Sequence, residues 1–258
     1  GSAGREERKA LIHQTKSRWL QTLSSMDHED DDPGTTWNAD ARKREPDRMS
    51  ARQAWRAIQA GLPKNAIISS DIGNNCAIGT AYPTLEKGRK YLAPGLFGPC
   101  GYGFPVIIGA KIGNPDIPCV GFAGDGAFGI SMSEMSSIGR EEYPGITMVI
   151  FRNYQWGAEK RNSILWFDDN FVGTELDPHL SYAKVAEGCG LKGVTVKTQA
   201  ELTEALRASC EAQKKRVTTF IEVILNQELG EPFRRDAMKK PTVVAGIRRE
   251  DMRPQQVA

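Results

Sequence analysis

The chain has 258 residues, of which 40% are hydrophobic, so it can bury one large core and is too apolar for wholesale disorder. Its formal net charge is +2, with Lys and Arg interleaved among Asp and Glu, whereas a nucleic-acid-binding protein gathers its basic residues on one face. No apolar run is long enough to cross a membrane, and the N-terminus lacks the layout of a signal peptide.

The five cysteines are an odd number and include no CxxC pair; they are Cys76, Cys100, Cys119, Cys189 and Cys210. This pattern argues against a disulfide framework or a zinc site, and it fits a reducing compartment. We therefore expect a cytoplasmic protein with neither a membrane nor a nucleic-acid partner.

The N-terminal region differs from the rest of the chain. Residues 5–25 are polar with a weak helical pattern, and we expect the acidic run at 26–34 to break any helix there. We interpret that run as a solvated linker, because cation-binding loops need regularly spaced oxygen ligands. The domain prediction is an arm or linker from a preceding domain over residues 1–48, and a single domain with a C-terminal extension over residues 49–258.

From residue 50 the elements follow in a clear order. Ser50 and Gln53 form a capping box for a helix that stops at Leu62-Pro63. The elements expected after it are a strand at 66–70, a helix at 101–112, a strand at 118–123, a helix at 131–140, a strand at 146–151, a helix near 180–188, a strand at 193–197, a helix at 199–214 and a strand at 218–225. This alternation predicts an α/β fold, a parallel sheet with helices on both faces.

Ligands bind such sheets at the carboxyl ends of the strands, where three turns carry unusual residues: 71–75, 98–105 and 124–129. The last one reads GxGxxG between a strand and a helix, which is the Rossmann dinucleotide fingerprint. Asp125 within it argues against a dinucleotide, because a carboxylate repels a pyrophosphate unless a divalent cation lies between them. The next strand ends at Arg152 and Asn153; the arginine keeps NADP open, and the asparagine suits Mg²⁺.

Asp125 and Asn153 end neighbouring predicted strands, so we expect them to face one another. With a backbone carbonyl just after Asn153, two phosphate oxygens and a water, they would complete the about six oxygens that Mg²⁺ requires. Backbone N–H groups near Gly126 and Ala127 would hold the phosphates. The alternative is a plain glycine-rich turn in which Asp125 caps the helix.

Gly124-Asp125-Gly126, followed after about two dozen residues by Arg152-Asn153, resembles the GDG and Asn-Asn signature of thiamine-diphosphate-dependent enzymes. Arg152 replaces the first asparagine of that pair. The resemblance implies that Asn153 binds the metal and that Gln155 donates its backbone carbonyl to it. It also implies that Asn74 and Asn75 contact the diphosphate, and that Cys100 stands where a bulky residue, often Met, supports the bent cofactor.

Within this superfamily the chain resembles the sulfoacetaldehyde acetyltransferase family from about Met26 onward. The stretches that carry this are 69–76, 121–129, 152–160 and 228–237. The resemblance implies thiamine diphosphate and Mg²⁺ as cofactors, and conversion of sulfoacetaldehyde and phosphate into acetyl phosphate and sulfite.

Two anions must then be held, and arginine suits both. Arg234 and Arg235 are the first candidates for this role, and Arg152 is a further one. Trp156 and Glu159 follow the metal loop closely enough to line the site.

The resemblance also implies partners: a pyrimidine-binding domain, from another part of the chain or another subunit, and a homo-oligomer. Three alternatives stay open: an enzyme of the acetolactate synthase type, an NADP-dependent Rossmann oxidoreductase and a non-catalytic cofactor-binding module.

Overall fold

The computed structural model describes residues 2–31, 47–84, 90–140, 142–166, 170–227, 243–244 and 247–248. The chain divides into two units, residues 1–40 and residues 41–258, and the first contains the helix α1 (Ser2–Asp31). The expectation that the acidic run at 26–34 breaks any helix is wrong for the first part of the run, because α1 extends into it as far as Asp31. Carboxylates are compatible with a helix, whereas the strong helix breakers Pro33 and Gly34 stand at the end of the run, outside the described residues. The origin of residues 1–48 in a preceding domain stays a prediction.

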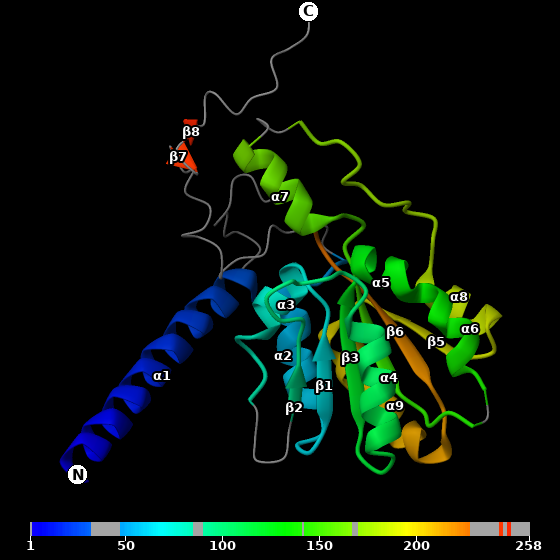
Figure 1. Ribbon diagram of the computed structural model, residues 1–258, viewed down its shortest axis with the longest axis horizontal. Coiled ribbons are helices and arrows are strands. Elements are labelled where there is room, and N and C mark those ends of the chain that lie inside the picture. The colour runs from blue at the N-terminus through cyan, green and yellow to red at the C-terminus, as the bar shows by residue number, and fades with distance from the viewer. Residues whose placement is uncertain are drawn as a thin grey trace, which may run out of the picture. The chain divides into compact units, whose positions relative to one another are not determined.

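The second unit is built on a six-stranded sheet with the order β2-β1-β3-β4-β6-β5 (Figure 1), in which every neighbouring pair is parallel. The strands are β1 (Ile67–Ser70), β2 (Lys90–Leu92), β3 (Cys119–Gly124), β4 (Thr147–Arg152), β5 (Lys192–Val196) and β6 (Thr219–Ile224). A separate antiparallel pair joins β7 (Val243–Val244) to β8 (Ile247–Arg248). The central strands β4 and β6 are buried along their whole length, as expected for a parallel sheet covered on both faces.

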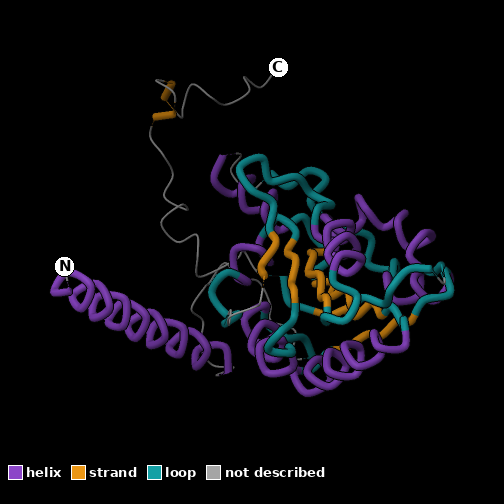
Figure 2. Tube along the Cα trace, turned by 60° about the horizontal axis from the view of Figure 1, so that its bottom comes forward, coloured by secondary structure: helices purple, strands orange, loops and turns teal. Residues whose placement is uncertain are grey.

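Helices cover both faces of the sheet, as predicted (Figure 2). Their bounds are α2 (Ala51–Gly61), α3 (Asn74–Gly79), α4 (Gly103–Gly113), α5 (Asp125–Ser131), α6 (Met135–Ile138), α7 (Gly157–Trp166), α8 (Tyr182–Gly188) and α9 (Gln199–Ala212), with 3₁₀ turns at Met132–Glu134 and Gln213–Lys215. One apolar cluster joins α2, α3 and α9 to the sheet and centres on Trp55 and Phe122. The other joins α4, α5, α6 and α8 to the opposite face and centres on Phe104, Phe128 and Phe220.

Local signals predicted some elements better than others. The capping box of Ser50 and Gln53 is present at the start of α2, whereas α3, α7, β2, β7 and β8 were not predicted. The turn expected at 124–129 is wrong in detail, because α5 already begins at Asp125. Helix propensity is low in this glycine-rich segment, but burial of Ala127 and Phe128 against the sheet overrides it.

The strand order places a topological switch between β1 and β3, since the chain continues from β1 to β2 on one side and to β3 on the other. Ligands of doubly wound sheets bind in the crevice at such a point. The order also differs from the 3-2-1-4-5-6 order of Rossmann domains, so the GxGxxG match does not mark one here. Within the described residues, no helix combines the length and the apolar character needed to cross a membrane.

The contact between α8 and β5 leaves no room for a side chain at Gly193, where an added Cβ would lie 2.2 Å from the carbonyl oxygen of Ala183. We expect Gly193→Ala to lower the free energy of unfolding by about 1–3 kcal/mol, because the helix must shift off the strand. Urea denaturation of the variant measures this. Gly188→Ala is the matched control, since nothing lies within 4 Å of an added Cβ there. Equal stability of both variants would contradict this packing.

Candidate functional site

A cavity of about 250 Å³ opens at the carboxyl ends of β1, β3 and β4. All three turns singled out in the sequence contribute to its lining. The predicted cofactor-binding residues that line it are Asn74, Cys100, Gly124, Gly126, Ala127 and Asn153. The predicted metal ligands Asp125 and Gln155 also line it, as do Trp156 and Glu159. The side chain of Asn75 and the whole of Arg234 and Arg235 lie outside the described residues.

Asp125, Asn153 and the Gln155 carbonyl form a group of three oxygen-bearing groups. That Asp125 and Asn153 face one another was expected from their places at the ends of neighbouring strands. The register pairs Gly124 of β3 with Phe151 of β4, so Asp125 and Asn153 follow adjacent strand ends. One terminal atom of the Asn153 amide lies 3.2 Å from Asp125 Oδ1 and 3.1 Å from the carbonyl oxygen of Gln155. As a nitrogen, this atom donates to both; as an oxygen, it makes a set of three oxygens. Ligands at about 2.1 Å from an octahedral Mg²⁺ lie about 3.0 Å apart, so these residues fit that ion.

The carboxylate of Asp125 is only 1% exposed, and burial raises its pKa to about 6 against the lowering effect of Arg152 and of backbone N–H groups. Oδ2 accepts hydrogen bonds from Arg152 Nη1 (3.0 Å) and from the backbone N–H of Tyr154 (2.7 Å). Oδ1 accepts one from the N–H of Gly126 (3.0 Å) and faces Asn153. Oδ1, the oxygen nearer to Asn153, therefore accepts fewer hydrogen bonds from the backbone and Arg152 than Oδ2 does.

The loop after β4 is held in an unusual conformation. Tyr154 has a φ of 60°, in the left-handed region that costs a residue with a side chain about 1 kcal/mol or more. Two hydrogen bonds fix this turn: Trp156 N–H to the Thr174 carbonyl (2.7 Å) and Leu176 N–H to the Tyr154 carbonyl (2.9 Å). The turn brings the Gln155 carbonyl back toward Asn153, which follows the backbone role predicted for Gln155.

Asn74 begins α3 with a side chain that makes no hydrogen bond to the residues that the structure describes. Both its Nδ2 and its Oδ1 are buried, and neither forms a hydrogen bond within the described part of the chain. An unpaired buried amide costs about 1–3 kcal/mol per group, and such exceptions in folded proteins call for a ligand or a water. Because Asn74 lines the cavity, a polar ligand there would satisfy it.

The indole of Trp156 packs on the backbone at Gly126. A Cβ at Gly126 would lie 2.8 Å from two carbons of that ring, so only glycine permits this approach. Glu159, in the first turn of α7, is exposed at the rim. Cys100 is also exposed, but desolvation together with the nearby Asp71 and Glu159 raises the pKa of its thiol. A neutral thiol suits a packing role rather than a nucleophilic one.

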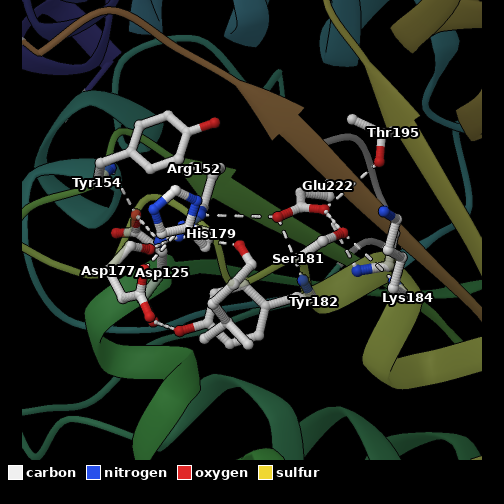
Figure 3. A network of polar contacts seen from close by, with 12 residues as sticks. Asp125, Arg152, Tyr154, Asp177, His179, Ser181, Tyr182, Lys184, Thr195 and Glu222 are labelled. Atoms are coloured by element: carbon white, nitrogen blue, oxygen red, sulfur yellow. Dashed lines mark hydrogen bonds and ion pairs between the residues drawn. The ribbon is translucent and has the colours of Figure 1, made fainter. Parts of the chain in front are cut away.

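Arg152 does not lie where the sequence suggested. It was a candidate for holding a substrate anion, but it is fully buried behind Asp125 and does not line the cavity. Figure 3 shows it between Asp125 and Glu222. It also donates to the carbonyls of Asp177 and Leu180. The candidate role fails because the guanidinium is buried away from the cavity and both of its terminal nitrogens already donate to protein oxygens.

Sequence reasoning missed two buried acids. Asp71 accepts hydrogen bonds from the N–H groups of Ile72 (2.9 Å), Gly101 (3.0 Å) and Gly103 (2.7 Å), and burial raises its pKa. It thereby joins the turn of Asn74 to the loop of Cys100. Glu222 lies within β6, and its signal was a charged residue inside an otherwise apolar strand.

Comparisons with known proteins agree with this geometry. A model of the family described as "Thiamine pyrophosphate enzyme, C-terminal TPP binding domain" matches residues 71–223. The chain is 78% identical over 255 residues to a probable sulfoacetaldehyde acetyltransferase of Rhizobium meliloti (strain 1021), covering 99% of this chain and 43% of the relative. It is 70% identical over 257 residues to a sulfoacetaldehyde acetyltransferase of Roseovarius nubinhibens, covering 100% and 43%.

More distant proteins share part of the chain. A probable acetolactate synthase large subunit of Methanococcus aeolicus is 28% identical over 159 residues, covering 62% of this chain and 26% of the relative. A solved structure, the thiamine diphosphate-dependent 4-hydroxybenzoylformate decarboxylase of Rhodococcus jostii RHA1, has the same fold with a TM-score of 0.65 and 24% identity, covering 72% of this chain and 34% of that one. The chain spans 43% of the length of the sulfoacetaldehyde acetyltransferases named above. With this fold, this cavity and a family match that covers most of the sheet, the chain belongs to the thiamine pyrophosphate enzymes, as their C-terminal TPP-binding domain.

Proposed function

We propose that this chain forms the diphosphate- and Mg²⁺-binding half of the active site of a sulfoacetaldehyde acetyltransferase. The reaction converts sulfoacetaldehyde and phosphate into acetyl phosphate and sulfite. The observation that carries the cofactor assignment is the position of the Asn153 amide, 3.2 Å from Asp125 Oδ1 and 3.1 Å from the Gln155 carbonyl oxygen. The substrate assignment is supported by the 78% and 70% identity to proteins of that name.

Thiamine diphosphate, when bound, supplies a carbanion that attacks a carbonyl and an electron sink for the fragment left behind. The residues of this chain hold and orient it. Asp125, Asn153 and the Gln155 carbonyl would bind Mg²⁺, and the unpaired Asn74 amide would donate to a diphosphate oxygen. Backbone N–H groups near Gly126 and Ala127 are proposed to bind the same group.

The remaining candidates surround the reacting end of the cavity. Trp156 would exclude water from the metal loop, and the neutral thiol of Cys100 would support the cofactor from the opposite turn. Glu159 is an exposed acid in the lining of the cavity, and it is proposed to contact the substrate. Arg234 and Arg235 are proposed for the sulfonate and the phosphate, because a guanidinium pairs with both in a bidentate manner.

A second chain or domain is part of this proposal. The cavity volume of about 250 Å³ lies below the about 300–1,000 Å³ of complete small-molecule sites, as expected for half a site. Leu96 and Phe97 are fully exposed on the loop that leads to Cys100. Exposed apolar side chains on a loop that contributes to the cavity favour contact with a partner, which we propose to be the pyrimidine-binding domain in a homo-oligomer. A cytoplasmic location is supported by the free thiols of Cys119 and Cys210.

The decisive test measures products from this chain purified together with the pyrimidine-binding domain that completes the proposed site, supplied with thiamine diphosphate, Mg²⁺, sulfoacetaldehyde and phosphate. We expect sulfite and acetyl phosphate in equal amounts, and neither when the cofactor or Mg²⁺ is left out. Acetolactate formed from pyruvate, without sulfite from sulfoacetaldehyde, would assign the chain to the acetolactate synthase type instead. Cofactor binding without turnover of either substrate would favour a binding module.

Replacing Asn74 with Ala tests the diphosphate contact. Because the buried amide has no partner, we expect an unchanged or higher Tm in the cofactor-free protein. The Kd for thiamine diphosphate should rise about tenfold or more, since hydrogen bonds to charged groups contribute about 1.5–3 kcal/mol. Quenching of tryptophan fluorescence measures it. Asn114→Ala is the control. It should lower Tm and leave the Kd unchanged, because Asn114 Nδ2 donates to the Ala110 carbonyl (3.0 Å) outside the cavity. An unchanged Kd in the Asn74 variant would remove this residue from the site.

Replacing Asp125 with Asn tests the metal contact. The amide can still accept from Arg152 and Tyr154, but it lacks the charge that attracts a divalent cation. We expect the Mg²⁺ concentration that half-saturates cofactor binding to rise at least about tenfold. Asp116→Asn, an exposed carboxylate outside the cavity lining, is the control. A Mg²⁺ requirement that is the same in all three proteins would place the metal elsewhere.

A further inference from the structure

Arg152 sets an electrostatic problem for the proposed metal site. Its Nη1 lies 3.0 Å from Asp125 Oδ2, and both side chains are at most 1% exposed. A buried positive charge so close to the ligand opposes a cation on the other side of that carboxylate. The superfamily signature has a neutral asparagine at this position, where the problem does not arise. A cation site built around Arg152 therefore needs a compensating negative charge.

Glu222 supplies that charge from the neighbouring strand. The register pairs Glu222 of β6 with Ile150 of β4, and Arg152 follows Ile150 by two residues on the same face of β4, so Arg152 and Glu222 are diagonal neighbours on that face. Glu222 Oε1 lies 3.7 Å from Arg152 Nε, and the carboxylate is 3% exposed. Figure 3 shows the guanidinium between the two acids. One positive and two negative formal charges leave a single negative charge, the value that Asp125 would have beside a neutral residue.

Both ends of this charge pair are held by further protein groups. In the hydrogen bonds that the structure describes for Glu222, its carboxylate is always the acceptor. The donors are Ser181 Oγ at 2.6 Å, Tyr182 N–H at 3.2 Å, Ala183 N–H at 3.3 Å and Thr195 Oγ1 at 3.4 Å. Donors on both oxygens are what a carboxylate accepts. Arg152 is held by the carbonyl of Leu180 (3.0 Å) and lies over the ring of Tyr154 at 4.3 Å. Neither charge can turn away from the other toward solvent.

We propose that Glu222 is a positioning residue that balances the charge of Arg152, so that the buried group of Asp125, Arg152 and Glu222 keeps a net negative charge for the divalent cation. The Arg152–Glu222 pair then has the same net charge as a single neutral asparagine, and Arg152 also fixes the Asp125 carboxylate through Oδ2. This inference rests on the proposed function, because it assumes a cation at Asp125. It assigns an electrostatic role in metal binding to a residue that does not line the cavity.

The test compares Mg²⁺ affinity, in the presence of thiamine diphosphate, among the wild type, Glu222→Gln, Arg152→Asn and the double variant. Titration calorimetry on the purified protein gives each Kd, and Tm without cofactor is recorded for each. Glu222→Gln keeps the shape of the side chain but leaves Arg152 uncompensated, so Mg²⁺ should bind about tenfold more weakly. Arg152→Asn should bind it as tightly as the wild type or more tightly. The double variant should regain an affinity within about threefold of the wild type, because the charge is again balanced.

A purely structural role gives a different pattern, in which the double variant is at least as weak as Glu222→Gln and Kd follows Tm. That result, or an unchanged Kd in Glu222→Gln, would overturn the inference. Glu211→Gln controls for the loss of a charge on the surface, since Glu211 is exposed on α9, and it should leave Kd unchanged. If Glu222→Gln does not fold, Arg152→Asn decides alone, because weaker Mg²⁺ binding there contradicts the proposal. Absence of Mg²⁺ and cofactor binding in the wild type would instead count against the proposed function.

Discussion

Asp125 places an acid at the junction of β3 and α5, where only 1% of the residue reaches solvent. Removing a carboxylate from water costs several kcal/mol unless charges and donors replace the water. The surrounding structure supplies them from three directions: Arg152 from β4, the backbone of the Tyr154 turn, and the Gly126 N–H in the first turn of α5. The left-handed turn at Tyr154 and the burial of an arginine are both understandable as responses to this one carboxylate.

The same constraint orders the site beyond the acid itself. The turn that presents the Tyr154 N–H also turns the Gln155 carbonyl toward Asn153, so one backbone conformation satisfies Asp125 and creates the third oxygen. On the other side of the crevice, Asp71 follows β1 and accepts hydrogen bonds from the N–H groups of Gly101 and Gly103, so it joins the loop after β1 to the start of α4. Two buried acids at the carboxyl ends of adjacent strands thus hold the loops that line the cavity, and the cavity shape depends on strand register more than on loop sequence.

Much of this arrangement could be predicted from the sequence, because it depends on local signals. Buried apolar runs indicated the main strands, the Ser50 capping box indicated α2, and strand ends indicated where Asp125 and Asn153 would meet. The helix α3 was missed because its six residues are too few to show a helical pattern, and α7 because its sequence lacks apolar periodicity. Arg152 was misread as an anion ligand because its partner Glu222 is 70 positions away in the chain (222 − 152 = 70), on a strand that only the tertiary register brings alongside.

The position of Arg152 between two carboxylates also limits which substitutions can be accepted at positions 152 and 222. A chain with Asn at position 152 has no cation to balance an acid at position 222, and a chain with Arg at position 152 needs one. Passage between the two arrangements by single substitutions leads through an intermediate with an unbalanced buried charge, whichever residue changes first. Positions 152 and 222 should therefore change together among relatives, so that the pair separates lineages within this family although neither residue lines the cavity at the carboxyl ends of the strands.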